Sequence, residues 1–451
     1  MSVENQTKSA LSPPQPVEFM QAFCFWFKLG FISFGGPAGQ IALMHQELVE
    51  RRRWISEKRF LHALNFCMVL PGPEAQQLAT YLGWMFHRTA GGLIAGGLFV
   101  LPSLLILIGL SWIYMAYGHL AVVAGVMYAI KPAVTAIVLM AAFRIGSRAL
   151  RHPLLWSIAG ASFVAIFWLG VPFPLIVMMA GLIGFLASLR MPEAFRLGAG
   201  HQASQHHFGA ALIDDDTPAP LHARFHWKRM LGWLALGLSI WALCMLGLGF
   251  FCGWDSVLMQ MGWFFSKAAL LTFGGAYAVL PYVFQGGVEQ FHWLTAPQMM
   301  DGLALGETTP GPLIMVVAFI GFVGGWSHQI FGAQGLFYAG AAGALVATFF
   351  TFLPSFFFIL IGGPVVESAQ GVIRLTAPLT GITAAVVGVI VNLAVFFAIH
   401  VLWPQGFAGH FDVFSCILGL FSALLLFRYQ WSVIRLIGVC AILGGVYSLL
   451  V

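Results

Sequence analysis

Long apolar segments recur along almost the whole chain, and they constrain its fold more than any other feature. They begin near residue 17 and continue to residue 451. About 20 consecutive apolar residues are enough to cross the hydrocarbon core of a bilayer. Only 8% of the residues are charged, whereas a soluble domain carries about 25%. The sequence therefore excludes a soluble globule and predicts a polytopic membrane protein.

Two backbone arrangements can span a bilayer, α-helices and closed β-barrels, because every N–H and C=O group there must be paired within the protein. A barrel would show as short segments that alternate between apolar and polar side chains, and such segments do not occur in this sequence. We therefore expect an all-α polytopic membrane protein. The six cysteines stand singly, without the paired spacing of metal ligands, so we expect neither a metal site nor a cofactor.

The chain also contains an internal repeat. When it is shifted along itself by 239 residues, residues 28–73 align without a gap on 267–312, with 12 identities in 46 positions. The identities gather in an FGG, an ExxxW and a PGP motif. We therefore predict two related halves, and divide the chain into a disordered N-terminal tail (1–16), a first repeat (17–190), a linker (191–228) and a second repeat (229–451).

The linker is polar and holds five histidines, His201, His206, His207, His222 and His226, beside the aspartates 214–216. These residues do not show the ligand spacing of a metal site. We interpret the linker as a solvated, flexible loop.

The FGG and PGP motifs predict broken helices. PGP lies in the middle of residues 60–86, and neither flank is long enough to span alone. FGGPAG interrupts residues 17–44 in the same way. Such irregular backbone is tolerated at membrane depth only where it is buried in protein or lines a cavity. We predict re-entrant hairpins at 17–44, 60–86, 256–284 and 297–324, and full spans at 90–117, 119–143, 153–170, 172–190, 229–252, 332–361, 375–400, 412–427 and 432–450.

The basic residues predict the orientation, because Lys and Arg are enriched in cytoplasmic loops. The basic clusters at 51–59, 144–151 and 190–229 all fall on one side of the membrane if each re-entrant hairpin leaves on the side from which it enters. Five spans then separate the two repeats, an odd number, so the repeats are inverted and the N-terminus and linker are cytoplasmic. In agreement, the loop 45–59 carries five basic residues and its repeat 284–298 carries none.

Inverted repeats with broken helices near the bilayer midplane are typical of secondary transporters. Each second half-helix begins just after FGG or PGP, so its free N–H groups and positive dipole end face the bilayer centre. Four such ends would converge on one place. This arrangement suits an anion.

Two lysines at membrane depth also indicate a negatively charged ligand. Lys28 and Lys267 occupy equivalent positions before FGG, and charges at this depth are expensive and commonly functional. They could form a cage for a dianion, or each could snorkel to an interface. The hydroxyls of Ser33 and Thr272 could bond substrate oxygens, or bond backbone carbonyls freed by the breaks.

Two glutamates are candidates for proton coupling. Glu74 follows the first PGP directly, and Glu307 precedes the second by three residues. Either could carry a proton across the membrane, although an acid in a first helical turn, as at Glu74, also favours the helix dipole. Lys131 has no repeat partner, and Asp301 is expected near the outer interface.

Several function classes remain to be separated. The leading class is a secondary anion transporter, and an anion channel is an alternative, because inward half-helices also line selectivity filters. An intramembrane enzyme is disfavoured, since HExxH, GxSxG and GxxxxGK[ST] motifs do not occur in this sequence. We therefore expect a protein that is not an enzyme.

Four motifs carry a family resemblance: FxxFGGP at 31–37, LLTFGG at 270–275, LPGPEAQQLATYLGW at 70–84 and ETTPGPL at 307–313. With them the chain resembles the chromate ion transporter family, in its long two-repeat form. The positions carried over are Phe34, Gly35, Gly36, Pro71, Gly72, Pro73 and Glu74 in the first half, and Phe273, Gly274, Gly275, Glu307, Pro310, Gly311 and Pro312 in the second.

The resemblance implies a bacterial inner-membrane exporter of chromate that gives chromate resistance and is driven by the membrane potential or the proton gradient. The alternative substrate is sulfate or another oxyanion, carried or exchanged, because chromate and sulfate are tetrahedral dianions of similar size. The partners expected are the oxyanion and the lipid bilayer. A homodimer is left open, and a nucleic-acid partner is not expected.

Overall fold

The computed structural model describes residues 15–191, 208–218, 220–273, 275–368 and 376–450. Residues 1–14, most of the expected N-terminal tail, and Gly274 of the second FGG motif lie outside these ranges, as do His201, His206 and His207 of the linker. The described residues are helical almost throughout, and the β-pairing within them is one isolated bridge between Ile55 and Ile213.

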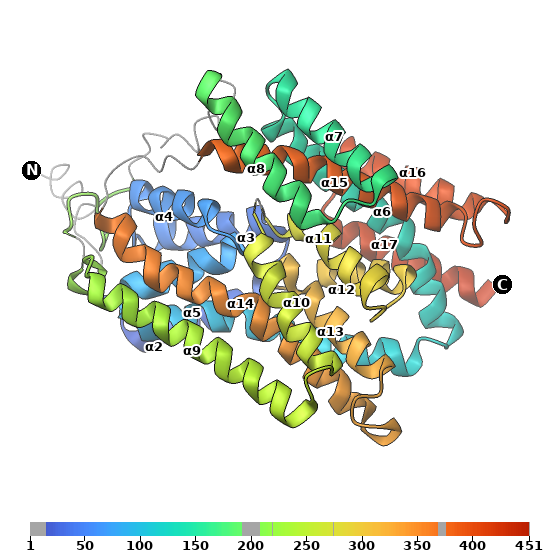
Figure 1. Cartoon of the computed structure of the whole chain (residues 1–451), viewed down its shortest axis with the longest axis horizontal. Coiled ribbons are helices and arrows are strands. Elements are labelled where there is room, and N and C mark those ends of the chain that lie inside the picture. Colours follow the sequence, from blue (N-terminus) through green and yellow to red (C-terminus); the bar gives the residue numbers. More distant parts are fainter. Residues whose placement is uncertain (1–14, 192–207, 219, 274, 369–375, 451) are drawn as a thin grey trace, which may run out of the picture.

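The described helices follow one another with short connections (Figure 1). Those of the first half are α2 (Phe19–Ile32), α3 (Gly36–His45), η1 (Gln46–Arg51), α4 (Glu57–Val69), α5 (Glu74–Tyr117), α6 (Ala121–Ala149), α7 (Pro153–Leu169) and α8 (Phe173–Arg190). Those that follow are η3 (Leu221–Ala223), α9 (Trp227–Cys252), α10 (Val257–Leu271), α11 (Ala276–Phe284), η4 (Gln285–Gln290), α12 (Ala296–Thr308), η5 (Leu313–Met315), α13 (Val316–Ser327), η6 (Ala333–Gly335), α14 (Leu336–Ser368), α15 (Thr376–Leu402), α16 (Val413–Phe427) and α17 (Val433–Leu450).

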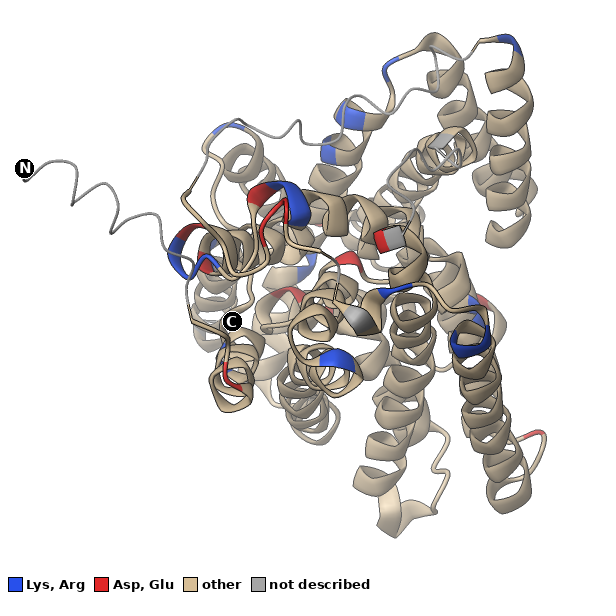
Figure 2. Ribbon diagram, turned by 90° about the vertical axis from the view of Figure 1, so that its left-hand side faces the viewer, with Lys and Arg blue, Asp and Glu red and all other residues tan. Residues whose placement is uncertain are grey.

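Six helices in the described part of the chain are long and apolar enough to cross a membrane: α5, α6, α8, α9, the helix spanning Ala333–Glu367, and α15. Most of the helical surface is free of charged residues, as the long tan stretches of Figure 2 show. The prediction of an all-α polytopic membrane protein is confirmed.

Helices break at all four motifs. α2 ends at Ile32 and α3 begins at Gly36, while α10 ends at Leu271 and α11 begins at Ala276. The two PGP motifs fall in the gaps between α4 and α5 and between α12 and η5. Their re-entrant course through a bilayer, and the inversion of the two repeats, stay predictions.

Helix α5 contains both the expected half-helix after PGP and the expected span 90–117. The backbone leaves helical geometry at His87 (φ −132°, ψ 36°) and Arg88 (φ 54°, ψ −152°). The two parts fold back on each other there, because a Cβ placed on Gly96 would lie 2.7 Å from Nε2 of Gln76, 20 residues earlier. A straight helix would separate these residues by about 30 Å. α5 is therefore a helical hairpin.

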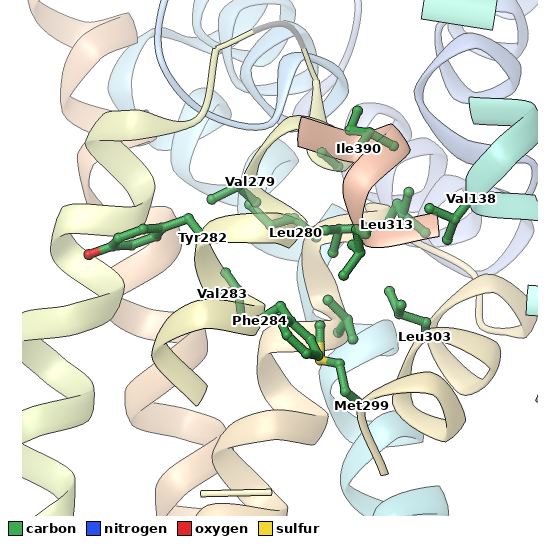
Figure 3. Close-up of a cluster of buried hydrophobic side chains, with 14 of the residues drawn as sticks. Val138, Val279, Leu280, Tyr282, Val283, Phe284, Met299, Leu303, Leu313 and Ile390 are labelled. Carbon is green, nitrogen blue, oxygen red and sulfur yellow. The ribbon is translucent and has the colours of Figure 1, made fainter. Parts of the chain in front are cut away.

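Two hydrophobic clusters form the core. The larger one includes α11, whose Leu280 lies beside Leu313 among other buried apolar side chains in Figure 3. The smaller one joins α2, α4 and the first part of α5 to the end of α14. α15 packs on α6, α7 and α8, whereas α14 packs on α5, α9, α10 and α13. The helices α11 to α13 lie almost wholly inside the bundle, as irregular backbone at membrane depth requires.

The linker differs from the expected flexible loop over its described residues. Leu212 and Ile213 donate backbone N–H groups to the carbonyls of Arg53 (3.0 Å) and Trp54 (3.1 Å), and Ser56 N–H donates to Ile213 O (3.0 Å). Ile213 is buried among the residues of the smaller core cluster. The expectation was wrong here because one apolar side chain and a short β-type pairing attach this polar segment to the first half.

Candidate functional site

The two halves exchange hydrogen bonds at their broken-helix motifs. Gly72 N–H of the first PGP donates to the carbonyl of Thr272, beside the second FGG (2.7 Å). Gly311 N–H of the second PGP donates to the carbonyl of Ser33, beside the first FGG (2.8 Å). Gln40 of α3 donates its side-chain amide to the carbonyl of Gly311 (2.5 Å). We call this reciprocal contact the junction.

Glycine is required at both PGP motifs. Gly72 has φ +126° and Gly311 has φ +108°, values that side chains rarely adopt. A Cβ on Gly72 would lie 2.5 Å from Oγ of Ser355, and one on Gly311 would lie 2.7 Å from Cβ of Ser103. Each glycine therefore packs against a serine of the opposite half, and the junction has room for hydrogen atoms only.

The hydroxyls beside the FGG motifs are already bonded. Ser33 and Thr272 are fully buried. Ser33 Oγ donates to Leu29 O (2.5 Å) and Thr272 Oγ1 donates to Ala268 O (2.7 Å), each four residues earlier in its own helix. This is the second of the two roles considered for them, the bonding of carbonyls at a helix end.

A cavity of about 2510 Å³ opens beside the junction. Its wall includes Gly35 and Gly36 of the first FGG, Gly275 of the second, and the two glutamates Glu74 and Glu307. It extends past α6 to α4 and the linker, where its charged lining residues include Lys58, Arg59, Arg144, Arg148, Asp215 and Asp216. The predicted topology places these last elements at the cytoplasmic side.

Three uncapped helix N-termini reach this cavity. The first residues of α3, α5 and α11 (Gly36, Glu74 and Ala276) line it, and side chains do not cap these helices. Their first-turn N–H groups lack partners within the helix and carry the positive end of the dipole. An anion in the cavity can therefore take hydrogen bonds from backbone that neither side-chain caps nor the helix itself satisfies.

The fourth expected N-terminus does not reach the cavity. Pro310, Gly311 and Pro312 are buried, and the chain enters a short 3-10 turn, η5. Leu313 then lies in the apolar cluster of Figure 3, beside α11. The sequence could not show this, because an apolar residue after PGP suits a core and a membrane span equally.

The other carried-over positions support the loops without lining the cavity. Pro71 is half-buried, Gly72 and Pro73 are buried, Phe34 is 39% exposed, and Phe273 packs against the larger core cluster. Gly274 is outside the described residues.

The lysine pair lies away from the cavity. Lys28 and Lys267 are both exposed on the outer faces of α2 and α10, and neither lines the cavity. Lys267 Nζ is 5.6 Å from the centroid of the Trp263 ring. Repeat equivalence put the two lysines at matching positions, but it did not fix which face of each helix they occupy.

Arg144 of α6 is a cation close enough to Glu307 to act on it. It lines the cavity and acts electrostatically on Glu307 and Tyr277. Its side chain makes neither a hydrogen bond nor an ion pair with the residues that the structure describes. Sequence reasoning assigned Arg144 to a cytoplasmic loop after residue 143, whereas α6 continues to Ala149 and places it on the cavity wall.

The two glutamates differ in their surroundings. Glu307 accepts a hydrogen bond from Tyr277 Oη (2.5 Å), in the first turn of α11. Glu74 stands with Oε1 4.0 Å from the position of a Cβ on Gly275. Each acid therefore meets the second FGG region, from opposite halves of the chain. Tyr277 was missed because its repeat partner is Ala38, which carries no signal.

Broken helices around a cavity that several charged side chains line, in a bundle of helices long and apolar enough to cross a membrane, are the architecture of a polytopic membrane transporter. The chain belongs to the chromate transporter family: the family model matches twice, over residues 20–185 and 259–445.

The relatives agree with this assignment. A chromate transport protein of Pseudomonas aeruginosa is 33% identical over 427 residues, which cover 93% of this chain and 89% of that protein. A chromate transport protein of Cupriavidus metallidurans is 28% identical over 411 residues, covering 91% and 88%. An uncharacterized transporter of Methanocaldococcus jannaschii is 24% identical over 428 residues, covering 94% and 93%. No solved structure matches.

Proposed function

We propose that this protein is a secondary transporter that exports chromate across the bacterial inner membrane and so confers chromate resistance. Family membership and the names of its relatives support chromate as the substrate. The observation that carries the site is the cavity beside the junction, which three helix N-termini without side-chain caps and the Arg144 side chain line. These groups supply the hydrogen-bond donors and the positive charge that bind a dianion.

In the proposed site, first-turn N–H groups of α3, α5 and α11 bind the oxyanion and Arg144 supplies the full charge. A guanidinium presents a planar set of donors that matches two oxygens of an oxyanion. Arg144 replaces the lysine pair in this proposal, because Lys28 and Lys267 face outward. Gly72 and Gly311 hold the loops in place without touching the substrate.

The lining of the cavity is compatible with export. It reaches the elements that bear the basic clusters, the side that the charge distribution predicts to be cytoplasmic. Chromate enters from that side, is held beside the junction, and leaves when one repeat rocks against the other. The two repeats are bonded to each other at the junction, so their relative movement changes access to the site.

The membrane potential supplies enough energy for export. Moving one charge across 100 mV is worth about 2.3 kcal/mol, so two negative charges leaving a negative interior gain about 4.6 kcal/mol. This free energy sustains a concentration ratio of about 2,000. Proton coupling through Glu74 or Glu307, both on the cavity wall, is an addition to this driving force and not a requirement.

Sulfate is the competing substrate. Backbone donors and an arginine recognise charge and the arrangement of oxygens, and chromate and sulfate share both. Chromate uptake into inside-out membrane vesicles, with an imposed potential and excess sulfate, tests the proposal. Saturable uptake driven by the potential supports export of chromate. Sulfate flux without chromate uptake would keep the anion carrier and reject chromate as its substrate.

A further inference from the structure

An ion pair with a buried carboxylate lies outside the cavity. Asp301 of α12 is 2% exposed, and its Oδ2 is 3.6 Å from Nζ of Lys131 on α6. The same Oδ2 accepts a hydrogen bond from Tyr114 Oη, at the end of α5 (2.8 Å). These three residues do not line the cavity. The pair therefore joins three helices without contributing to the proposed substrate site.

The ion pair is separated from the cavity-lining charges Arg144 and Glu307 along the same two helices, α6 and α12. Lys131 and Arg144 are 13 residues apart on α6, a separation of about 20 Å along a helix. Asp301 and Glu307 are six residues apart on α12, about 9 Å. Since α6 packs against α12, both helices lead from the ion pair to the cavity, with the pair nearer their N-terminal ends.

One oxygen of the carboxylate is free to take a proton. Both contacts of Asp301 reach Oδ2, while Oδ1 is buried and lacks a hydrogen-bond partner among the described residues. A buried carboxylate oxygen without a donor is costly, and protonation removes that cost because the acid is neutral. The free lone pairs of Oδ1 are where the proton would add.

Few titratable groups surround Asp301 among the described residues. The groups that act on it are Lys131 and Tyr114. Four further described elements pack on α12. Two of them, α13 and η5, carry no titratable side chain. On α15, His400 bonds Phe396 O. On α17, Cys440 meets Ser422, Tyr447 stacks on Tyr128 and Phe414, and Arg435 is exposed. Glu307 lies on α12 itself, at the cavity.

We propose that Asp301 binds a coupling proton and that its pairing with Lys131 closes the side of the transporter away from the cavity-lining charges until the proton arrives. A proton from the aqueous phase adds to Oδ1, and the carboxylate becomes a neutral acid. Lys131 keeps its ammonium charge and loses its counter-charge, so α6 and α12 are held together less strongly. An O–H bond is the single covalent bond that forms. This inference rests on the proposed function and adds a proton site remote from the substrate.

Two flux assays with the full chain in proteoliposomes test it. One measures net chromate uptake driven by a pH gradient, with the potential clamped at zero. The other measures exchange of labelled chromate at equal pH on both sides. Asp301→Asn mimics the protonated acid and cannot titrate, so we expect the gradient-driven uptake to fall at least tenfold while exchange stays within threefold. Asp255→Asn, the same change at an exposed acid, should alter neither.

Other outcomes reject the inference in distinguishable ways. A normal response of Asp301→Asn to the pH gradient would overturn it, as would a wild-type chain whose chromate uptake ignores the gradient. If Asp301→Asn does not fold, the double variant Lys131→Gln/Asp301→Asn removes both charges together. Loss of exchange in a folded double variant would make the pair structural. If the wild-type chain moves no chromate in either assay, the proposed function fails first.

Discussion

The junction predicts that one methyl group at Gly72 stops transport. In Gly72→Ala the residue must keep φ near +126° and place Cβ 2.5 Å from Ser355 Oγ and 2.6 Å from Gln77 Nε2. Holding an alanine in such a conformation costs about 1–3 kcal/mol. Moving the loop to relieve the clash loses the bond from Gly72 N–H to Thr272 O, about 1 kcal/mol.

The strain disfavours only the intact junction, by about 1–3 kcal/mol, so the ratio of intact to displaced loops falls about 5- to 150-fold. We expect a matching fall in the chromate uptake rate per folded molecule in proteoliposomes. Gly97→Ala is the matched control, because a Cβ at Gly97 meets no atom within 4 Å. Uptake by folded Gly72→Ala within twofold of the wild type would refute the reasoning.

Three further predictions follow from the same structure. Arg144→Gln loses a charge-assisted hydrogen bond to the anion, about 1.5–3 kcal/mol, so the KM for chromate should rise about 10- to 150-fold in flux kinetics. Lys28→Gln should leave the KM unchanged, and equal effects of the two substitutions would argue against the site. Burial beside Trp84 lowers the pKa of the His222 imidazole, so the undocked linker takes up a proton first as the pH falls through about 6.5, and acid favours undocking. Protection of residues 208–226 against hydrogen exchange, relative to the intrinsic rate at each pH, should therefore be lower at pH 5.5 than at neutral pH in the wild type but not in His222→Gln. Equal protection at both pH values in the wild type would reject this. Cysteines at the exposed positions Arg51 and Gln290 should be labelled from opposite faces of the membrane, whereas labelling from the same face would contradict the inverted topology.

The ends of most helices could be predicted from the sequence. The expected spans 153–170 and 172–190 became Pro153–Leu169 and Phe173–Arg190, because the Pro and Gly residues beside those apolar runs stop helices locally. The breaks at FGG and PGP were predicted for the same reason. Local signals of this kind do not depend on the rest of the fold.

What faces the cavity could not be predicted in this way. The helices are apolar nearly all round, so periodicity does not reveal which side of α2 or α10 points inward, and the lysines were placed in the site by repeat equivalence alone. The reciprocal bonds of Gly72 and Gly311 join residues about 200 or more positions apart in the chain. Lys131 and Asp301 were interpreted separately, and their pairing depends on the packing of α6 on α12.

The most direct test of the proposed site is a structure of the protein with chromate bound, in which the anomalous signal of chromium locates the anion. The account predicts the chromium beside the first turns of α3 and α11, with chromate oxygens within hydrogen-bonding distance of the Arg144 guanidinium. Chromium on the outer face of α2 or α10, next to Lys28 or Lys267, would contradict it.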